Sequence, residues 1–300
     1  MRRRLRIIAN GKAASDPALR EAVHSLRHSG VELEMRVTWE GGDAVRFAGE
    51  AVREGVDTVI AAGGDGTINE VVTGMLVAPV ERLPSLGILP MGTANDFATA
   101  CGLPLDILPA LQLVCTLPPT WIDVGQVGGR FFINMATGGF GTQITVDTPA
   151  ESKRALGGLA YLLTGLSRFS GIAAETGHFN GPGFHWDGDF LVLAVGNGRM
   201  AGGGHPLCPD ACLNDGLLDV HILPNADAGS ALWTSLVDGV EAVAREVFVS
   251  VRTPTLEVSV PAGLAINLDG EPLQGSHFRF EVRRSALAVH LPLDCPMLLR

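Results

Sequence analysis

The chain has 300 residues, of which 46% are hydrophobic and 18% charged, with 38 glycines and a formal net charge of −10. This composition is typical of a globular, loop-rich protein rather than a disordered one, and the length allows one large domain or two ordinary ones. The negative charge argues against broad nucleic-acid binding and strong electrostatic adhesion to anionic membranes, because both need clustered Lys and Arg.

The first part of the chain alternates strands and helices. Strands are predicted at residues 5–9, 31–37, 58–62 and 86–89, and helices at residues 17–28, 43–54 and 68–76. Asp16 and Pro17 are typical of a helix start, and Gly30 and Gly55 follow helix ends. A βαβ series with this spacing predicts a Rossmann-like parallel sheet that binds ligands at the carboxyl ends of its strands.

From about Trp121 the pattern changes to short β-rich segments separated by Gly, Pro and Asp. These segments are residues 131–135, 190–195, 217–223, 256–260, 264–268, 278–282 and 287–291. Such spacing favours an antiparallel sandwich or barrel. We therefore expect an α/β domain over residues 1–122 and a β-sandwich domain over residues 123–290.

Neither a membrane span nor a signal peptide is expected. The longest mainly apolar stretch, residues 155–166, is too short and too broken by glycines to cross a bilayer. Residues 1–6 are rich in Arg and lead into a short strand instead of a hydrophobic region. Five cysteines without a regular framework fit reduced thiols, so we expect a cytoplasmic enzyme.

A glycine-rich turn, Gly63-Gly-Asp-Gly-Thr67, lies between the third strand and the next helix. Backbone N–H groups gather at a helix N-terminus, which makes it a suitable place for phosphate. Asp65 would repel phosphate oxygens unless a cation bridges the two or backbone N–H groups bind its carboxylate. Neither the P-loop motif nor the dinucleotide fingerprint fits here. We interpret the turn as a nucleotide site with Mg²⁺, although a glycine turn after a strand can also be only a turn.

A second loop, residues 90–98, follows the fourth strand with the sequence P-M-G-T-A-N-D-F-A. Gly92 would let the backbone approach a ligand, and the Thr93 hydroxyl can donate to a phosphate oxygen. Asn95 can hold the loop or a sugar, or Asn95 or Asp96 can simply cap the helix that follows. Thr38 and residues 10–12 end two other strands, so we expect them near the same ligand.

Two pairs of carboxylates occur in the second part, Asp215 with Asp219 and Asp269 with Glu271. Mg²⁺ prefers oxygen ligands, and phosphoryl transfer needs a carboxylate to accept the proton of the attacking hydroxyl. Asp-Gly is also the commonest hairpin turn, so either pair alone could be structural. Their coexistence with the glycine loop favours the functional interpretation.

These motifs resemble the diacylglycerol kinase and sphingosine kinase superfamily. The resemblance is carried by G-G-D-G-T-I-N-E at residues 63–70 and L-G-I-L-P-M-G-T-A-N-D-F-A at residues 86–98. Segments at residues 36–44, 132–142, 196–204 and 267–273, with the C-terminal tail, are similar to the YegS group of bacterial lipid kinases. The resemblance implies an ATP-dependent lipid kinase that phosphorylates a hydroxyl of a membrane lipid, with phosphatidylglycerol or diacylglycerol as candidates. It also implies that the tail, residues 291–300, returns to the first domain.

The resemblance further assigns roles to individual residues. The nucleotide would be held by Thr38, Gly64, Asp65, Gly66, Thr67, Ile68, Asn69, Glu70 and Thr93. A site for Mg²⁺ or another divalent cation would consist of Asp215 with the backbone carbonyls of Cys212 and Leu217. The proton acceptor is implied in the D-G-E segment. We favour Glu271 over Asp269 because its side chain reaches further, with Asp65 as the next candidate.

Three alternatives stay open. An NAD kinase shares the G-G-D-G-T loop and the broad fold, although the G-T-A-N-D-F-A loop weighs against it. A non-catalytic nucleotide- or lipid-sensing module is disfavoured by the intact carboxylates. His205, Cys208 and Cys212 include zinc-binding groups, but their spacing lacks a fourth ligand.

The expected partners are ATP and a membrane lipid, with transient association at the inner leaflet and without nucleic acid; the sequence leaves the oligomeric state open. Local basic groups could serve a lipid headgroup, among them Arg2, Arg3, Arg4 and Arg6 at the N-terminus. Charged strand ends in water are the more common role for such residues.

Overall fold

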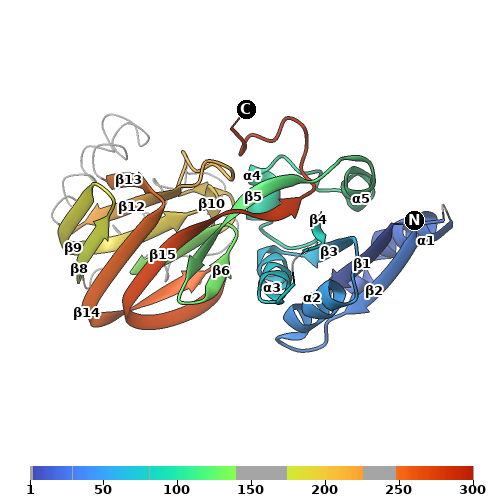
Figure 1. Ribbon diagram of the computed structural model, residues 1–300, viewed down its shortest axis with the longest axis horizontal. Helices are drawn as coiled ribbons and strands as arrows, with labels where there is room; N and C mark the ends of the chain where they lie inside the picture. The colour runs from blue at the N-terminus through green and yellow to red at the C-terminus, as the bar shows by residue number, and fades with distance from the viewer. Residues whose placement is uncertain (1–2, 29, 81, 140–173, 226–247, 300) are drawn as a thin grey trace. The chain divides into compact units, whose positions relative to one another are not determined.

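The computed structural model describes residues 3–28, 30–80, 82–139, 174–225 and 248–299 (Figure 1). The chain forms two compact units. Unit 1 consists of residues 1–123, 284–298 and 300, and unit 2 of residues 124–283 and 299. The apolar stretch at residues 155–166 lies outside the described residues.

Unit 1 is built on a parallel sheet. Its first four strands are β1 (Arg4–Ala9), β2 (Glu32–Val37), β3 (Thr58–Gly63) and β4 (Ser85–Pro90), in the spatial order β2-β1-β3-β4. Every neighbouring pair among them is parallel. The chain proceeds outward from β1 to β2 and then outward on the other side through β3 and β4. The carboxyl ends of β1 and β3 therefore form the topological switch point at which such sheets bind ligands.

Helices pack against both faces of this sheet, as parallel sheets require. The helices described in this unit are α1 (Pro17–His28), α2 (Asp43–Arg53), α3 (Asp65–Leu76), α4 (Asp96–Ala100) and α5 (Ile107–Thr116), with a 3-10 turn at Ala13–Ser15. Leu19 of α1 and Leu111 of α5 share a buried cluster with Ile7 of β1 and Ile60 of β3. Helices α2 and α3 pack against each other. The predicted α/β class is confirmed for this part of the chain.

Two predictions for unit 1 need correction. Helix α3 begins at Asp65 and not at residue 68, because Gly64 has the extended conformation of an N-cap residue and the next residues form the first turn. Helix α5 was not predicted from the sequence. Its N-cap, Asp106, makes no side-chain capping hydrogen bond. Its apolar residues form a short run, and hydrophobic periodicity alone does not distinguish a helix from a buried strand in such a run.

Unit 2 is rich in antiparallel strands, as the sequence predicted. They are β5 (Thr120–Val127), β6 (Arg130–Phe132), β7 (Met135–Gly139), β8 (Glu175–Gly181), β9 (Phe184–Gly196), β12 (Leu218–Pro224), β13 (Val249–Thr253), β14 (Thr255–Leu268) and β15 (Glu271–Val289), with a small hairpin of β10 (Met200–Ala201) and β11 (His205–Pro206). Strands β5 and β15 each continue into unit 1. The main order is β13-β12-β9-β7-β14-β15, and β8 pairs with both β9 and β14. Because β9 and β14 each pair with β8 in one half and with β7 in the other, the sheet wraps round its core.

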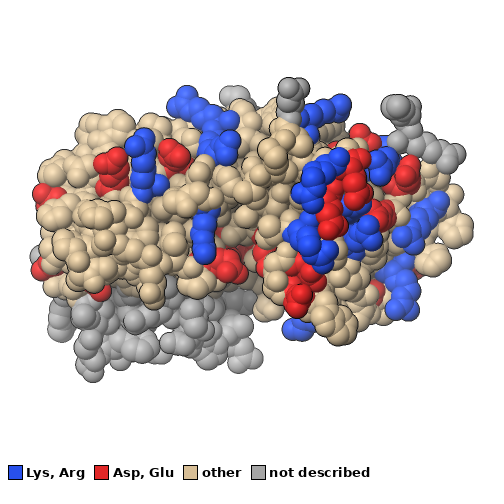
Figure 2. Space-filling view, turned by 60° about the horizontal axis from the view of Figure 1, so that its bottom comes forward, with Lys and Arg blue, Asp and Glu red and all other residues tan. Residues whose placement is uncertain are grey.

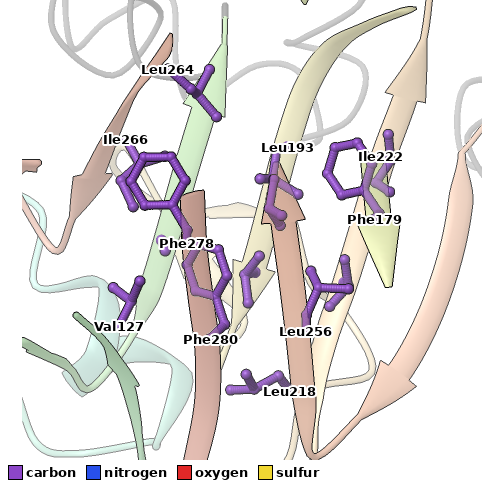
Figure 3. Close-up of a cluster of buried hydrophobic side chains, with 14 of the residues drawn as sticks. Val127, Phe179, Leu193, Leu218, Ile222, Leu256, Leu264, Ile266, Phe278 and Phe280 are labelled. Atoms are coloured by element: carbon purple, nitrogen blue, oxygen red, sulfur yellow. The ribbon is translucent and has the colours of Figure 1, made fainter. Parts of the chain in front are cut away.

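Alternating apolar residues of these strands fill that core. Figure 3 shows Phe179, Leu193, Ile222, Leu256 and Phe280 gathered from β8, β9, β12, β14 and β15. All five are almost completely buried. Burying one such side chain contributes about 1.5–3 kcal/mol, so this cluster contributes strongly to the stability of unit 2.

The strand boundaries in unit 2 differ from the predicted ones. The predicted strand at residues 131–135 is two strands, β6 and β7. They are separated at Ile133, whose backbone N–H donates to the Asp269 carboxylate. The segments at residues 256–260 and 264–268 form one strand with an irregularity between them. Residues 278–282 belong to β15, which continues to Val289, and β5, β8 and β13 were not predicted.

Charges of both signs are interleaved on the surface, and Figure 2 shows Lys and Arg beside Asp and Glu on one face. Arg6 is 1% exposed and forms ion pairs with Glu34 and Glu54, each at 2.5 Å. The Arg4 side chain lies 3.5 Å from that of Glu32. The arginines of β1 thus pair with acidic neighbours, which favours their role in the sheet over a role in binding lipid headgroups.

Candidate nucleotide and metal sites

The loops after β1 and β3 meet at the switch point of unit 1. Asn10, directly after β1, accepts a hydrogen bond from the Ala13 N–H at 2.7 Å through Oδ1. Its Nδ2 donates to the Thr67 hydroxyl at 3.4 Å. One side chain therefore links the start of the 3-10 turn to the glycine loop.

The glycine loop ends in the first turn of α3. Its N-cap, Gly64, makes no side-chain capping bond, and the first backbone bond of this helix runs from the Ile68 N–H to the Gly64 carbonyl at 3.1 Å. The N–H groups of Asp65, Gly66 and Thr67 precede that bond, so they have no acceptor within the helix. They lie at its N-terminus, which is the positive end of the helix dipole. This arrangement suits a phosphate group.

Not all predicted nucleotide residues are equally placed for that role. The side chains of Ile68 and Asn69 are buried, with 0% and 4% exposure of the residues. Ile68 already uses its N–H within the helix. Gly66 is exposed, and Gly64, Thr67 and Glu70 are half-buried. The groups best placed for phosphate therefore lie at residues 64–67.

Asp65 points to the second loop. Its two carboxylate oxygens accept hydrogen bonds from the N–H groups of Asp96 at 3.1 Å and Phe97 at 3.0 Å. These are the first residues of α4, so Asp65 caps this helix from a neighbouring loop. A carboxylate can lie beside phosphate if a cation bridges the two or if backbone N–H groups bind the carboxylate. In the structure, backbone N–H groups bind the Asp65 carboxylate.

The two loops also touch through their backbones. A Cβ atom on Gly92 would collide with the Gly64 Cα, so the close approach depends on glycine at residue 92. Asn95 has φ of 53° and bonds Gly92 twice, accepting from its N–H at 2.9 Å and donating to its carbonyl at 3.0 Å. Asn95 thus holds the loop and does not cap α4, while Thr93 beside it is exposed to solvent.

A hollow of about 680 Å³ adjoins these loops within unit 1. Lys12 and Asp16 line it from the region after β1, Met91 and Gly92 from the second loop, and Ile107 from α5. Its volume falls in the range of small-molecule sites.

Thr38, half-buried after β2, donates its N–H to the Ala9 carbonyl at 2.9 Å and so lies at the same edge of the sheet.

The predicted metal residues of unit 2 form a tight turn. Asp215 accepts the Leu217 N–H at 2.9 Å through one carboxylate oxygen, and the other oxygen is paired with Arg252. The Asp215 side chain is 6% exposed. A carboxylate with the carbonyls of Cys212 and Leu217 is an oxygen-only set, so its chemistry fits Mg²⁺. A cation bound there would take the place of the Arg252 guanidinium.

Asp269 and Gly270 form a two-residue hairpin turn between Leu268 of β14 and Glu271 of β15, as the Asp-Gly pattern allowed. Asp269 has φ of 48° and its carboxylate accepts N–H groups of Ile133 at 2.7 Å, Asn134 at 3.2 Å and Met135 at 2.7 Å. Glu271 is exposed at the start of β15. Asp269 is therefore fixed as an anchor for the segment between β6 and β7, whereas the Glu271 side chain is exposed to solvent.

The zinc-binding groups considered from the sequence are arranged differently. The structure brings Cys208 together with Asp219 and His221, a group that sequence spacing did not indicate. The sequence does contain one indication of this group: Asp219 and His221 are two residues apart in a strand, so their side chains lie on the same face.

Among the described residues, none of the helices has the length and apolar character needed to cross a membrane.

Both parts of the chain match known protein families. The family model described as diacylglycerol kinase catalytic domain matches residues 4–127, and the one described as YegS C-terminal NAD kinase beta sandwich-like domain matches residues 138–291. A protein of Pseudomonas savastanoi pv. phaseolicola named "Probable lipid kinase YegS-like" is 50% identical over 298 residues, covering 99% of this chain and 96% of that protein.

A protein with the same name from Yersinia pestis (strain Pestoides F) is 47% identical over 293 residues, and the match covers 97% of this chain and 98% of that protein. Among solved structures, a diacylglycerol kinase from Bacillus anthracis str. Sterne aligns with a TM-score of 0.78 at 24% identity, covering 97% of this chain and 98% of that one. The structural likeness at this identity establishes a shared fold.

Proposed function

Because the chain belongs to the family of YegS-like lipid kinases with a diacylglycerol kinase catalytic domain, we propose that it transfers the γ-phosphate of ATP to a hydroxyl of a membrane lipid. The proposed acceptor is of the phosphatidylglycerol or diacylglycerol type. The observation that carries the proposal is the coupling of two glycine loops at the switch point, where Asp65 caps α4 and Gly92 meets Gly64.

In this proposal the nucleotide phosphates bind the N–H groups of residues 64–67 and the exposed Thr93 hydroxyl. Thr38 and the neighbouring hollow offer contacts for the rest of the nucleotide. Asp65 acts indirectly, since it holds the second loop against the first. Phosphoryl transfer depends mainly on positioning and on charge stabilisation, and rigid loops supply the positioning.

We assign the proton-accepting role to Glu271, which is exposed, and not to Asp269, whose carboxylate is bonded to backbone N–H groups. Asp215 with the carbonyls of Cys212 and Leu217 would hold Mg²⁺ or another divalent cation. When bound, that ion would contribute positive charge that offsets the charge of the phosphates. The reaction would take place at the cytoplasmic surface of the membrane, with transient association of the protein.

The test is incubation of the purified protein with labelled ATP, Mg²⁺ and mixed micelles that each contain one lipid. A labelled phospholipid product from phosphatidylglycerol or diacylglycerol is the expected result. A parallel reaction with NAD⁺ separates the alternative of an NAD kinase. Product from NAD⁺ alone, or ATP binding without any transfer, would overturn the proposal.

A further inference from the structure

A second group of metal-binding side chains lies inside unit 2. The Cys208 sulfur, a carboxylate oxygen of Asp219 and an imidazole nitrogen of His221 all lie within 4.8 Å of one another. Exposure is 0% for Cys208, 3% for Asp219 and 8% for His221. The group is separate from the Asp215 carboxylate, which is bonded to Leu217 and Arg252.

The strand positions bring these three side chains together. Asp219 and His221 project from the same face of β12, opposite the face that carries the core residue Val220. Asp219 pairs in register with Gly196 of β9. A Cβ atom on Gly196 would lie 2.5 Å from the Cys208 Cβ, so the glycine leaves the space that Cys208 fills. The thiol is thereby held over the strand, next to Asp219.

His221 is oriented as a ligand. Its Nδ1 lies 2.8 Å from the Ser250 hydroxyl on β13, the kind of second contact that fixes the ring of a metal-binding histidine. Its Nε2 lies 3.2 Å from Asp219 Oδ1. That contact lacks hydrogen-bond geometry, and Nε2 is a buried nitrogen without a hydrogen-bond partner among the described residues. The His221 Nε2 lone pair is therefore not used by a hydrogen bond and is available to a metal ion within the group.

We propose that Cys208, Asp219 and His221 bind one Zn²⁺ ion, with a water molecule as the fourth ligand. Tetrahedral zinc with sulfur, nitrogen and oxygen ligands needs ligand separations of about 3.3–3.6 Å, so only a small closure of the group is required. A thiolate and a carboxylate neutralise the two positive charges, which permits burial of the ion. Binding releases the thiol proton to solvent as the sulfur–zinc bond forms. The soft sulfur favours zinc over Mg²⁺.

Such an ion would close the base of the loop between Cys208 and Asp219. That loop carries Cys212, Asp215 and Leu217, so zinc would hold in place the residues assigned to the other cation. The zinc proposal itself rests on the geometry of the trio and does not depend on the lipid kinase reaction.

Cobalt provides a direct test. The full chain, freed of any tag and stripped of metal with a chelator, is titrated with Co²⁺. We expect a thiolate-to-cobalt charge-transfer band that saturates at one equivalent and is displaced by Zn²⁺. The band should disappear in Cys208→Ser and persist in Cys295→Ser, which alters another buried thiol, and in Asp215→Ala, which alters the other site. Ser250→Ala should weaken cobalt binding about 10- to 100-fold.

Absence of the band in the wild-type protein, or its persistence in Cys208→Ser, would overturn the proposal. If Cys208→Ser does not fold, X-ray absorption at the zinc edge of the wild-type protein gives the answer without a variant. One sulfur with nitrogen and oxygen neighbours supports the site, whereas a shell of oxygen alone refutes it.

Discussion

Asp269 and Glu271 are separated by one glycine, yet their surroundings give them different roles. The carboxylate of Asp269 is bonded to three consecutive N–H groups, whereas Glu271 is exposed. Glu271→Gln should therefore lower kcat by about 10²- to 10⁴-fold with little change in the KM for ATP or in stability, because it removes the proposed base without touching the fold. Steady-state kinetics on the preferred lipid measure this effect.

The matched change Asp269→Asn should act on stability first. The amide presents N–H groups toward backbone N–H groups, so the free energy of unfolding should fall by about 1–3 kcal/mol in urea denaturation. Glu257→Gln is the control, since Glu257 is an exposed carboxylate of the same unit with a loose ion pair to Arg279 at 3.6 Å. If Asp269→Asn keeps full stability and loses kcat while Glu271→Gln is active, the assignments must be exchanged.

Asp65 links the two glycine loops by capping α4. Asp65→Asn should remain folded but lose most kinase activity, with an unfolding free energy lower by about 1 kcal/mol, because an amide oxygen replaces only part of the cap. Glu32→Gln is a suitable control because Glu32 is an exposed carboxylate of the same unit with only a loose ion pair to Arg4 at 3.5 Å. Wild-type turnover of the Asp65 variant, measured with labelled ATP, would contradict the proposed role.

At the scale of elements, the two glycine loops behave as one structure. Gly92→Ala would force a Cβ atom into the backbone at Gly64, and overpacking of this kind costs about 1–3 kcal/mol. We expect weaker binding of an ATP analogue, measured by titration calorimetry, as the loops move apart. Gly41→Ala should bind normally, since a Cβ there meets nothing within 4 Å. Equal affinity in both variants would show that the loops are independent.

Elements with local signals were predictable from the sequence. Helix α1 has the predicted bounds, Pro17–His28, because Asp16 caps it by accepting the Ala18 N–H at 2.8 Å and Gly30 follows it. The break between β6 and β7 was not predictable, because it depends on a carboxylate more than a hundred residues away in the chain. The same holds for the site: the glycine loop is a local motif, whereas the cap from Asp65 to α4 and the trio around Cys208 arise from tertiary contacts.

At the scale of the whole chain, a buried histidine connects the C-terminal strand to the start of unit 1. His290 Nδ1 donates to the Leu117 carbonyl at 2.8 Å, Nε2 accepts from Arg3 at 2.8 Å, and the Ser85 hydroxyl lies 3.0 Å from Nε2. Burial lowers the pKa of His290 from 6.5 to about 4. The neutral ring is thus the form that fits the folded protein.

This pKa shift predicts how stability depends on pH. Above pH 6.5 the ring is neutral in both folded and unfolded chains, so its contribution is fully present. Between pH 6.5 and about 4 the unfolded chain binds a proton that the folded chain does not, so stability falls. Urea midpoints between pH 7.5 and 4 should decline more steeply for the wild type than for His290→Gln. Parallel curves would exclude His290 as the cause.

Strand β15 has a consequence for how the protein is made. Residues up to 283 belong to unit 2, while residues 284–298 belong to unit 1, where Val289 pairs with Leu86 on the outer side of β4. A ribosome therefore completes the first 123 residues long before it supplies the segment that pairs with β4. During that interval β4 lacks this partner, and unpaired strand edges promote association between chains. The order of synthesis thus makes the nascent α/β unit depend on the last part of the chain.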